Sequence, residues 1–248
     1  MAPPSPLQQC VEIIENFSMH EKTKFFDARE KLQKSQLKER KKILGGALLR
    51  LEGGLVFHEN KVKRALAQKL PSNQDIRSFD KIVDVLTRID KELIGCEAFK
   101  KQVCMMVGTW IATGIVSGTL NPLEGHWCFL GPTGSGKTKC AEMVGQLRCA
   151  LGGLVVGDVV KTKLSDLKAS YEGQTEEKTT CHILSCLGSV MLVDGSHGLG
   201  NGSAYGDQVV TQMLTDLNLF KKHICVIFTG YKDKMAEMFM RHKGIRSR

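Results

Sequence analysis

The sequence of 248 residues predicts an α/β fold in which helices flank a parallel sheet. From residue 127 onward, short apolar segments of strand length alternate with longer segments that have helical periodicity. This alternation is typical of parallel strands joined by crossover helices. The first 88 residues instead place their apolar side chains at helical spacing only. With 42% hydrophobic and 25% charged residues, the composition is that of an ordinary globular chain.

Four strands and several helices are expected in the second part of the chain. The expected strands cover 127–130, 157–161, 190–193 and 224–229, and the expected helices cover 139–151, 176–187 and 208–220. Loops at the carboxyl ends of such strands gather at one edge of the sheet, where α/β proteins bind their ligands.

The first part of the chain is expected to form helices. They cover 7–44, 56–70 and 75–91. The long first helix is expected to end at Gly45-Gly46, because adjacent glycines favour a break. We therefore divide the chain into a helical N-terminal region, residues 1–88, and an α/β domain, residues 89–248.

A phosphate-binding loop follows the first expected strand. The residues of this loop are Gly131, Pro132, Thr133, Gly134, Ser135, Gly136, Lys137 and Thr138. The glycines of the pattern G-x-x-x-x-G-K-T let successive backbone N–H groups point at the phosphates of a nucleotide. Lys137 is expected to bind the β- and γ-phosphates, and the hydroxyl of Thr138 to bind Mg²⁺. The N-terminus of the following helix also favours an anion. The sequence therefore predicts an ATP site with Mg²⁺.

Asp194 is the second candidate ligand for the metal ion. It follows the apolar segment 189–193, and a carboxylate at the end of a strand beside a phosphate loop commonly holds Mg²⁺. Taken alone, the pattern favours an ordinary buried strand with a turn aspartate before Gly195. With the phosphate loop upstream, we favour a metal role shared with Thr138.

The net charge of +9 is concentrated in the first third of the chain and raises the possibility of nucleic-acid contact. The basic residues there lie opposite an apolar helical face, so a solvated surface is the preferred explanation. An uncharged segment at 103–123 is long enough to span a membrane. Its glycines, its hydroxyl residues and the Asn121-Pro122 break favour a buried helix packed on the nucleotide domain. We expect neither a nucleic-acid nor a membrane partner.

Nine cysteines occur without a C-x-x-C pair or zinc spacing, so buried, reduced thiols are expected. The N-terminal sequence has neither the basic nor the apolar region of a secretory signal. A reducing, intracellular compartment, most simply the cytoplasm, is the expected location.

The order of motifs resembles that of AAA+ ATPases of the red-type Rubisco activase and stage V sporulation protein K group. The resemblance covers roughly residues 90–248. The motifs that carry it are Leu93-Ile94-Gly95, the phosphate loop, 165–167 with 171–175, the strand ending in Asp194, TGYKDKM at 229–235 and GIRSR at 244–248. The last of these is shared by few other phosphate-loop proteins.

The resemblance implies an oligomeric ATPase, hexameric in this family, that remodels protein complexes. Arg246 and Arg248 match arginines that reach the γ-phosphate of the neighbouring subunit, so that hydrolysis depends on assembly. Ile94 and Gly95 match the segment that lines the adenine pocket. Together with Lys137 and Asp194, the two arginines form the expected catalytic set.

Two further family elements match only in part. Tyr171 and Gly173 match a pore loop that grips a threaded polypeptide, but Glu172 stands where the family has an apolar residue. Thr229 lies in the sensor strand, where an asparagine is expected and none occurs.

The chain also departs from the family where hydrolysis is concerned. Gly195 replaces the glutamate that normally activates the attacking water, so we expect hydrolysis to be weakened. His197 is an alternative base near neutral pH, although a turn histidine is more often simply exposed. The family continues past Arg248 into a helical lid. Either the given sequence is a fragment of a longer chain, or the lid is absent and we expect hexamer assembly to be impaired.

Three functions therefore stay open from the sequence. The first is an ATPase that remodels a protein client, which the sequence does not name. The second is a switch or scaffold that binds ATP without hydrolysing it. The third is a nucleic-acid-associated ATPase.

Overall fold

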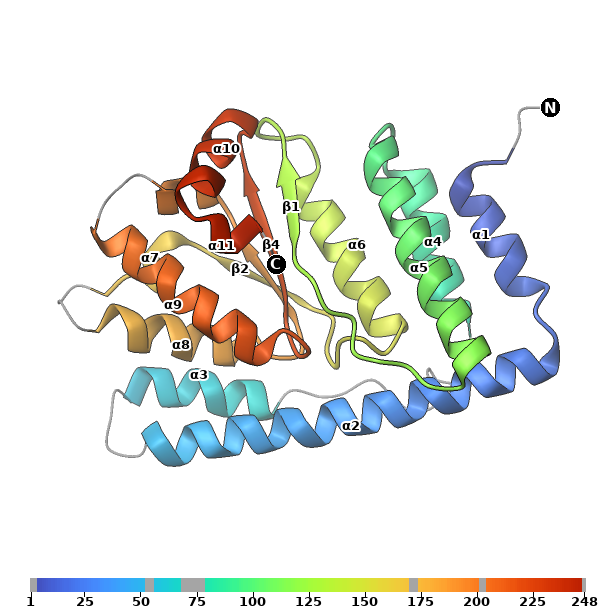
Figure 1. Ribbon diagram of the computed structural model, residues 1–248, viewed down its shortest axis with the longest axis horizontal. Coiled ribbons are helices and arrows are strands. Elements are labelled where there is room, and N and C mark those ends of the chain that lie inside the picture. The colour runs from blue at the N-terminus through green and yellow to red at the C-terminus, as the bar shows by residue number, and fades with distance from the viewer. Residues whose placement is uncertain (1–3, 52–55, 68–78, 170–173, 201–203, 247–248) are drawn as a thin grey trace.

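The computed structural model describes residues 4–51, 56–67, 79–169, 174–200 and 204–246, and Figure 1 shows a parallel sheet with helices packed around it. The strands are β1 (Trp127–Leu130), β2 (Val159–Thr162), β3 (Val190–Val193) and β4 (Cys225–Gly230). All neighbours are parallel, in the order β1-β4-β3-β2, with Trp127 opposite Ile227 and Val190 opposite Cys225. The predicted fold class is confirmed.

The helices of the α/β part cover both faces of the sheet. They are α6 (Lys137–Ala150), α7 (Leu164–Leu167), α8 (Thr175–Ser185), α9 (Ala204–Phe220), α10 (Lys232–Arg241) and α11 (Lys243–Arg246), with a short 3-10 helix, η2 (Ser196–Gly200), after β3. Val190 and Leu192 of β3 pack with α6, whereas Met191 and Val193 pack with α8 and α9. The side chains of β3 therefore alternate between two apolar cores, which explains why this strand is apolar throughout.

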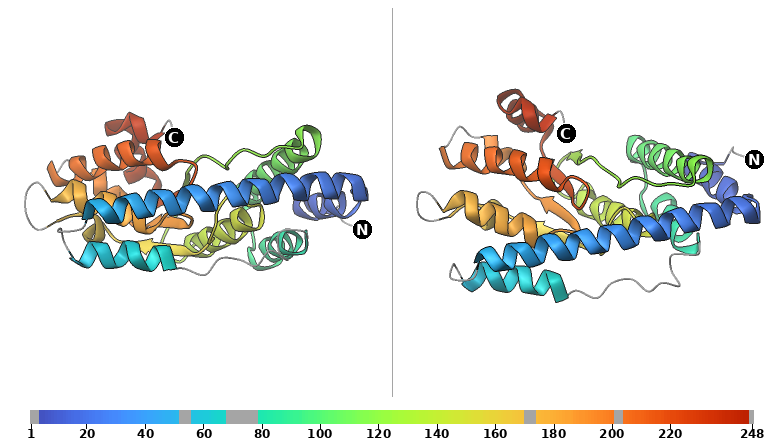
Figure 2. Two further views of the ribbon diagram at one scale, coloured as in Figure 1. Left: turned by 90° about the horizontal axis from the view of Figure 1, so that it is seen from below. Right: turned by 60° about the horizontal axis from the view of Figure 1, so that its bottom comes forward.

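The helices that precede β1 lie along the side of the sheet. They are α1 (Pro6–Glu15), α2 (Met19–Leu51), α3 (Val56–Ala67), α4 (Asp80–Glu92), which crosses residue 88, and α5 (Glu97–Ser117), which lies in the predicted α/β domain. Figure 2 shows α2 running along the length of the molecule, with α3 beside one of its ends. The predicted helices over 56–70 and 75–91 correspond to α3 and α4, and residues 68–78 lie outside the described part.

The prediction of a single helix over 7–44 is wrong in two respects, because the helix is interrupted near Ser18 and it continues beyond Leu44. A break separates α1 from α2, because Ser18 begins α2 with a capping box. The Ser18 backbone N–H donates to Glu21 Oε2 (2.8 Å), and the Glu21 N–H donates to Ser18 Oγ (3.3 Å). At the other end, α2 continues through Gly45-Gly46 to Leu51. Each glycine costs roughly 1 kcal/mol relative to alanine, but buried Leu44 and Ala47 pack the helix against α3.

Two buried polar side chains fasten α2 to the sheet domain. Arg40 donates to the carbonyls of Leu187 (2.6 Å) and Ala65 (2.8 Å), and Gln36 donates to the carbonyl of Lys222 (2.8 Å). Burial lowers the pKa of Arg40. The expected solvated basic face is correct for the lysines of α2, whereas Arg40 is 2% exposed and serves packing. A division of the chain at residue 88 stays a prediction.

The uncharged segment predicted over 103–123 forms α5, which begins earlier and ends at Gly118 with a left-handed C-cap (φ 67°). It packs mainly on α1 and α2, and only its start reaches the sheet, through Phe99 on Trp127 (ring centroids 5.9 Å apart). The predicted packing on the nucleotide domain is therefore only partly correct. A Cβ on Gly114 would lie 2.7 Å from the Phe25 ring, so this glycine permits the close crossing with α2. No described helix is long and apolar enough to cross a membrane.

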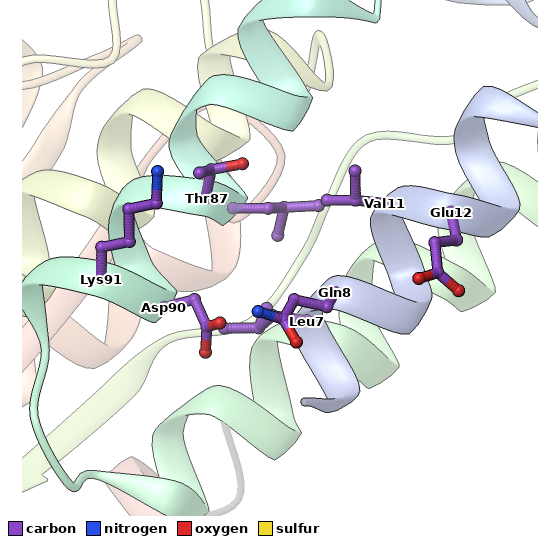
Figure 3. Close-up of a pocket in the computed structure, with 8 residues that line it drawn as sticks. Leu7, Gln8, Val11, Glu12, Thr87, Asp90 and Lys91 are labelled. Atoms are coloured by element: carbon purple, nitrogen blue, oxygen red, sulfur yellow. The ribbon is translucent and has the colours of Figure 1, made fainter. Parts of the chain in front are cut away.

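A cavity of about 200 Å³ lies between α1 and α4, as Figure 3 shows. Leu7, Val11 and Leu86 form its apolar wall, and Glu12, Asp90 and Lys91 are among its polar residues. None of the residues that line this cavity belongs to the phosphate loop, so the cavity is separate from the site described next.

Candidate functional site

The predicted phosphate loop joins β1 to α6 at the carboxyl edge of the sheet. Gly134 (φ 81°) and Gly136 (φ 80°) take left-handed conformations, which glycine adopts without strain. A Cβ on Gly131 would lie 2.8 Å from Ser135 Oγ, so a side chain there would force the Ser135 hydroxyl to move. The Gly131 N–H donates to the Gly230 carbonyl (3.1 Å), which anchors the loop to β4.

Lys137 is directed into the loop. Its Nζ donates to the carbonyl oxygen of Gly131 (3.0 Å) and contacts Ser135 Oγ (3.3 Å), and it also donates to the Pro132 carbonyl. Phosphate oxygens are stronger acceptors for an ammonium group than carbonyls. No acidic residue lies in the first turn of α6, so nothing there competes with an anion. The loop therefore fits a polyphosphate.

Asp194 lies at the carboxyl end of β3 and is exposed to solvent. The hydroxyl of Thr229 donates to Asp194 Oδ1 (2.8 Å), which fixes one oxygen of the carboxylate. Thr229 stands on β4, the strand between β1 and β3. Asp194, Thr229 and the phosphate loop thus occupy the same edge of the sheet, as expected for a nucleotide site.

The two predicted protein ligands are enough to bind Mg²⁺ only if phosphate oxygens of the nucleotide also coordinate the ion. Within the described residues, no group of three or more His, Cys, Asp or Glu side chains is placed to hold a metal ion. The predicted ligands are the hydroxyl of Thr138 and the carboxylate of Asp194, both oxygen donors of the kind that Mg²⁺ prefers. Mg²⁺ usually retains waters and binds phosphate oxygens beside one or two protein ligands. The two residues match that pattern.

Gly195, the residue after Asp194, lacks a carboxylate and also has a backbone conformation that disfavours one. Gly195 has a left-handed backbone (φ 64°), which a residue with a side chain adopts only under strain. The nearest atom that a Cβ on Gly195 would meet is His197 Cε1, at 3.9 Å. The imidazole of His197 therefore borders the space into which a glutamate at 195 would extend.

His197 lies in η2 beside the phosphate loop. Its Nδ1 is buried and has no hydrogen-bond partner. Its ring lies 5.7 Å from the ring of Tyr231, whose hydroxyl is 3.2 Å from Thr133 Oγ1 in the loop. Ser196 anchors the start of η2 by donating to the carbonyl of Thr229 (2.9 Å). A chain of contacts thus joins His197 to the phosphate loop through Tyr231.

Sequence reasoning missed the part played by Thr229 and Tyr231. We expected an asparagine in the sensor strand and regarded its absence as a loss, but the hydroxyl of Thr229 supplies the polar contact to Asp194. The TGY motif at 229–231 was the available signal, since a hydroxyl at the end of a strand beside Asp194 lies within reach of it.

The segment predicted to line the adenine pocket lies beside the start of α6. Leu93 is buried, whereas Ile94 is 96% exposed and Gly95 takes a left-handed conformation (φ 76°). An ion pair between Glu92 and Lys139 (2.8 Å) connects this segment to α6. The Lys139 hydrogen bond, with that of Arg88, lowers the pKa of Glu92. The structure thus brings Ile94 and Gly95 next to the helix that follows the phosphate loop.

Several predicted residues cannot be placed. The backbone of Arg246 belongs to α11, but its side chain lies outside what the structure describes. Arg248 and the pore-loop residues Tyr171, Glu172 and Gly173 lie outside the described residues altogether. Their roles stay predictions.

Comparison with known proteins agrees with this geometry. Residues 127–247 match the model of the ATPase family associated with various cellular activities (AAA). The chain is 30% identical over 176 residues to a chloroplastic cbbX homolog of Guillardia theta, covering 68% of this chain and 47% of that protein. It is 29% identical over 175 residues to a chloroplastic ribulose bisphosphate carboxylase/oxygenase activase of Cyanidioschyzon merolae, covering 67% and 56%.

A third relative matches over a shorter stretch of the chain. The ESX-1 secretion system protein EccA1 of Mycobacterium tuberculosis is 30% identical over 128 residues, which are 50% of this chain and 22% of that protein. The chain spans about half the length of the two chloroplastic relatives. The matches place an AAA ATPase domain at residues 127–247 and confirm the predicted phosphate-loop fold.

Proposed function

We propose that this AAA ATPase domain binds ATP with Mg²⁺ and hydrolyses it slowly. We propose also that it is the ATPase domain of a protein that remodels protein complexes. The observation that carries the proposal is the carboxyl edge of the sheet. There the glycine loop, with Lys137 directed into it, lies on the same side as a carboxylate fixed by Thr229.

Each residue has a definite task in this proposal. The backbone N–H groups of the loop and the ammonium of Lys137 bind the phosphates, and Ile94 and Gly95 lie against the adenine. Thr138 and Asp194 hold Mg²⁺, which when bound neutralises charge on the transferred phosphate. The hydrogen bond from Thr229 keeps the carboxylate of Asp194 oriented toward that ion.

Hydrolysis is slow in this proposal because Gly195 offers no group to orient or deprotonate water. A general base typically contributes about 10² to 10⁴-fold to the rate. His197 borders the space beside Gly195 through its Cε1, whereas its Nδ1 is buried beside Gly230, so Nε2 is the ring nitrogen that would act on water in this proposal. We propose that His197 takes over part of the water-activating role.

We propose the assembly of several copies and the action on a client protein because the chain resembles the AAA+ family. Arg246 and Arg248 are proposed to reach the nucleotide of a neighbouring copy, which makes hydrolysis depend on concentration. The relative from Cyanidioschyzon merolae is named for ribulose bisphosphate carboxylase/oxygenase. A shared fold does not transfer a substrate, so the client here is a protein complex of unspecified kind.

Phosphate release from Mg²⁺-ATP tests the proposal. We expect slow release that increases more than linearly with protein concentration and falls to background in Lys137→Ala. Lys101→Ala is the matched control, because Lys101 is an exposed lysine of α5 outside the loop. Binding of a fluorescent ATP analogue without phosphate release by the unmodified protein would support a non-hydrolysing switch instead. Absence of both would reject nucleotide chemistry altogether.

A nucleic-acid-associated ATPase is the second candidate. It is favoured by five exposed lysines of α2 that recur at helical spacing along one face, namely Lys31, Lys34, Lys38, Lys41 and Lys42. Only Lys34 has a carboxylate partner, Glu30 at 2.6 Å, among the described residues. Retardation of duplex DNA at low salt that weakens steeply as salt is added would support this function. Unretarded DNA at low salt would remove it.

A further inference from the structure

A pocket outside the nucleotide site lies between α5, the segment that precedes β1, and α6. It has a volume of about 430 Å³, which is within the range typical of sites for small molecules. Its lining includes Met105 and Met106 of α5 and both tryptophans of the chain, Trp110 and Trp127. We call it the tryptophan pocket. A largely apolar and aromatic lining is typical of a site for an organic molecule.

The tryptophan pocket lies at the ends of β1 and α6 that are far from the phosphate loop. Trp127 is the first residue of β1, whereas the loop follows the last residue, Leu130. Arg148, which also lines the pocket, lies in the last turn of α6, and Lys137 begins that helix. These two residues of α6 are ~16 Å apart along the helix axis. The pocket is therefore distinct from the nucleotide site.

Arg148 brings a buried positive charge to the tryptophan pocket, since it is only 3% exposed. It donates to the carbonyls of Leu123 (3.3 Å), Glu124 (3.5 Å) and Gly125 (3.0 Å), which hold the guanidinium beside the segment that precedes β1. Its Nε is buried without a hydrogen-bond partner, and no carboxylate of a described residue pairs with it. Because buried arginines are normally paired with an acidic group, the unbalanced charge of Arg148 points to an acidic ligand.

The other ionisable residues of the lining do not balance this charge. Glu124 is the acidic residue among the described residues that line the pocket, and its carboxylate is paired with Lys221 Nζ at 2.9 Å. His126 accepts the backbone N–H of Val226 through its Nδ1 (3.1 Å). A charge beside an apolar wall is screened less than a charge in water, so Arg148 attracts an anion into the pocket.

The apolar wall favours an aromatic ligand. The sulfur atoms of Met105 and Met106 make favourable contacts with aromatic rings, and methionine side chains adapt their shape to a ligand. Met105 is 57% exposed, so this wall is accessible from solvent. Trp110 Nε1 donates to the carbonyl of Asn121 (3.4 Å), so the N–H of this indole is already bonded and its ring carbons remain for contact with a ligand.

We propose that the tryptophan pocket binds a small aromatic anion, a molecule with a planar apolar ring system and a carboxylate or sulfonate group. The ring system packs on the methionines and the indoles, and the anionic group lies on the side of Arg148. This site is independent of nucleotide binding and lies beyond the proposed function.

The probe that tests this site is 1-anilinonaphthalene-8-sulfonate, an aromatic sulfonate whose fluorescence increases on binding. N-phenyl-1-naphthylamine has the same ring system without the sulfonate and is the matched neutral probe. Fluorescence titration gives the Kd of each probe for each variant. We expect Arg148→Met to raise the Kd of the sulfonate at least about tenfold while the Kd of the neutral probe stays within about twofold, because only the sulfonate loses a charge-assisted interaction.

Arg148→Lys is the conservative variant. Both substitutions remove the guanidinium bonds to the carbonyls of residues 123–125, but lysine keeps the positive charge. We expect the Kd of the sulfonate in Arg148→Lys to stay within about threefold of that of the unmodified protein. The difference between the two variants therefore separates the charge from the packing of the segment before β1.

Gln102→Glu tests the charge without changing a buried residue. Gln102 is an exposed residue of α5 that lines the pocket, so a carboxylate there keeps the shape of the wall and repels an anion. We expect the Kd of the sulfonate to rise about threefold to tenfold and the Kd of the neutral probe to stay unchanged. Gln208→Glu is the matched control, because Gln208 is an exposed residue of α9 that does not line the pocket.

Two measurements establish where the sulfonate binds. The chain has only two tryptophans, so its proton–nitrogen NMR spectrum contains two indole signals, and we expect both to shift as the sulfonate is added. Saturating Mg²⁺-ATP is expected to leave the Kd of the sulfonate unchanged, because the phosphate loop lies at the other end of β1 and α6.

Three outcomes would overturn the proposal. One is folded protein whose indole signals do not shift at any concentration of the sulfonate. Another is displacement of the sulfonate by Mg²⁺-ATP, which would place it in the nucleotide site. The third is an equal response of the sulfonate and the neutral probe to Arg148→Met and to Gln102→Glu, which would show that the pocket does not recognise an anion.

Discussion

Two loops at the carboxyl edge of the sheet differ in what they supply. The phosphate loop between β1 and α6 has a glycine at each left-handed position and an ammonium group directed inward. The loop after β3 also contains a left-handed glycine, Gly195, and in the proposed function this position lacks the carboxylate that would activate water. In the proposed function, nucleotide binding depends on the phosphate loop and the rate of hydrolysis depends on the loop after β3, so binding and hydrolysis are separable.

Introducing a carboxylate at position 195 is expected to have the largest effect. We expect Gly195→Glu to raise kcat for ATP hydrolysis about 100-fold, the lower end of what a general base contributes, because the left-handed backbone at 195 opposes the substitution. ATP affinity is expected to stay unchanged. Gly195→Gln is the control, since it introduces the same strain without a carboxylate. Equal rates for the two variants would show that the loop after β3 does not limit turnover.

Removing the proposed substitute base gives the next largest effect. We expect His197→Gln to lower kcat between about tenfold and 100-fold while KM is unchanged, because the imidazole acts on water and not on the bound nucleotide. Steady-state kinetics measures this, with His20→Gln as control because His20 is an exposed residue of α2. A change in KM alone would mean that His197 only supports Tyr231 and the phosphate loop.

The hydrogen bond from Thr229 to Asp194 is tested by measuring the Mg²⁺ requirement of hydrolysis. We expect Thr229→Val to raise the Mg²⁺ concentration needed for half-maximal activity about tenfold, because an unoriented Asp194 binds the ion less well. Thr229→Ser keeps the hydroxyl and is expected to restore the response. An unchanged Mg²⁺ requirement in the valine variant would contradict the orienting role of Thr229.

The sequence was sufficient for the parts of the fold that have local signals. The apolar runs predicted the strands to within two residues, and the glycine pattern predicted the phosphate loop. The strand expected at 157–161 begins only at Val159, because Gly157 turns the chain with φ 79°. The break between α1 and α2 was missed because side-chain hydrogen bonds at Ser18 interrupt an otherwise continuous helical periodicity.

Contacts between distant residues had no local signal. Thr229 lies on β4 and Asp194 directly follows β3, so only the fold brings the two residues together. The sequence predicted the chemistry of the site from the type of each residue. It did not predict which partners orient those residues.

The smallest effects are expected from alanine substitutions of two left-handed glycines, which separate the effect on stability from the effect on nucleotide binding. Gly134 (φ 81°) and Gly195 (φ 64°) both have room for a methyl group, since nothing lies within 4 Å of a Cβ at 134 and only His197 Cε1 lies at 3.9 Å at 195. We expect alanine at either position to lower the free energy of unfolding by about 1 kcal/mol, measured by urea denaturation.

Binding is expected to distinguish the two alanine variants. In Gly134→Ala the backbone relaxes away from the left-handed region, which turns the loop N–H groups away from the phosphates, so ATP affinity measured by calorimetry falls about fivefold, equivalent to about 1 kcal/mol. In Gly195→Ala the same relaxation occurs in a loop without phosphate contacts, so affinity stays unchanged. Equal losses of affinity in both variants would mean that the loop after β3 also binds the nucleotide, and the separation of binding from turnover would not hold.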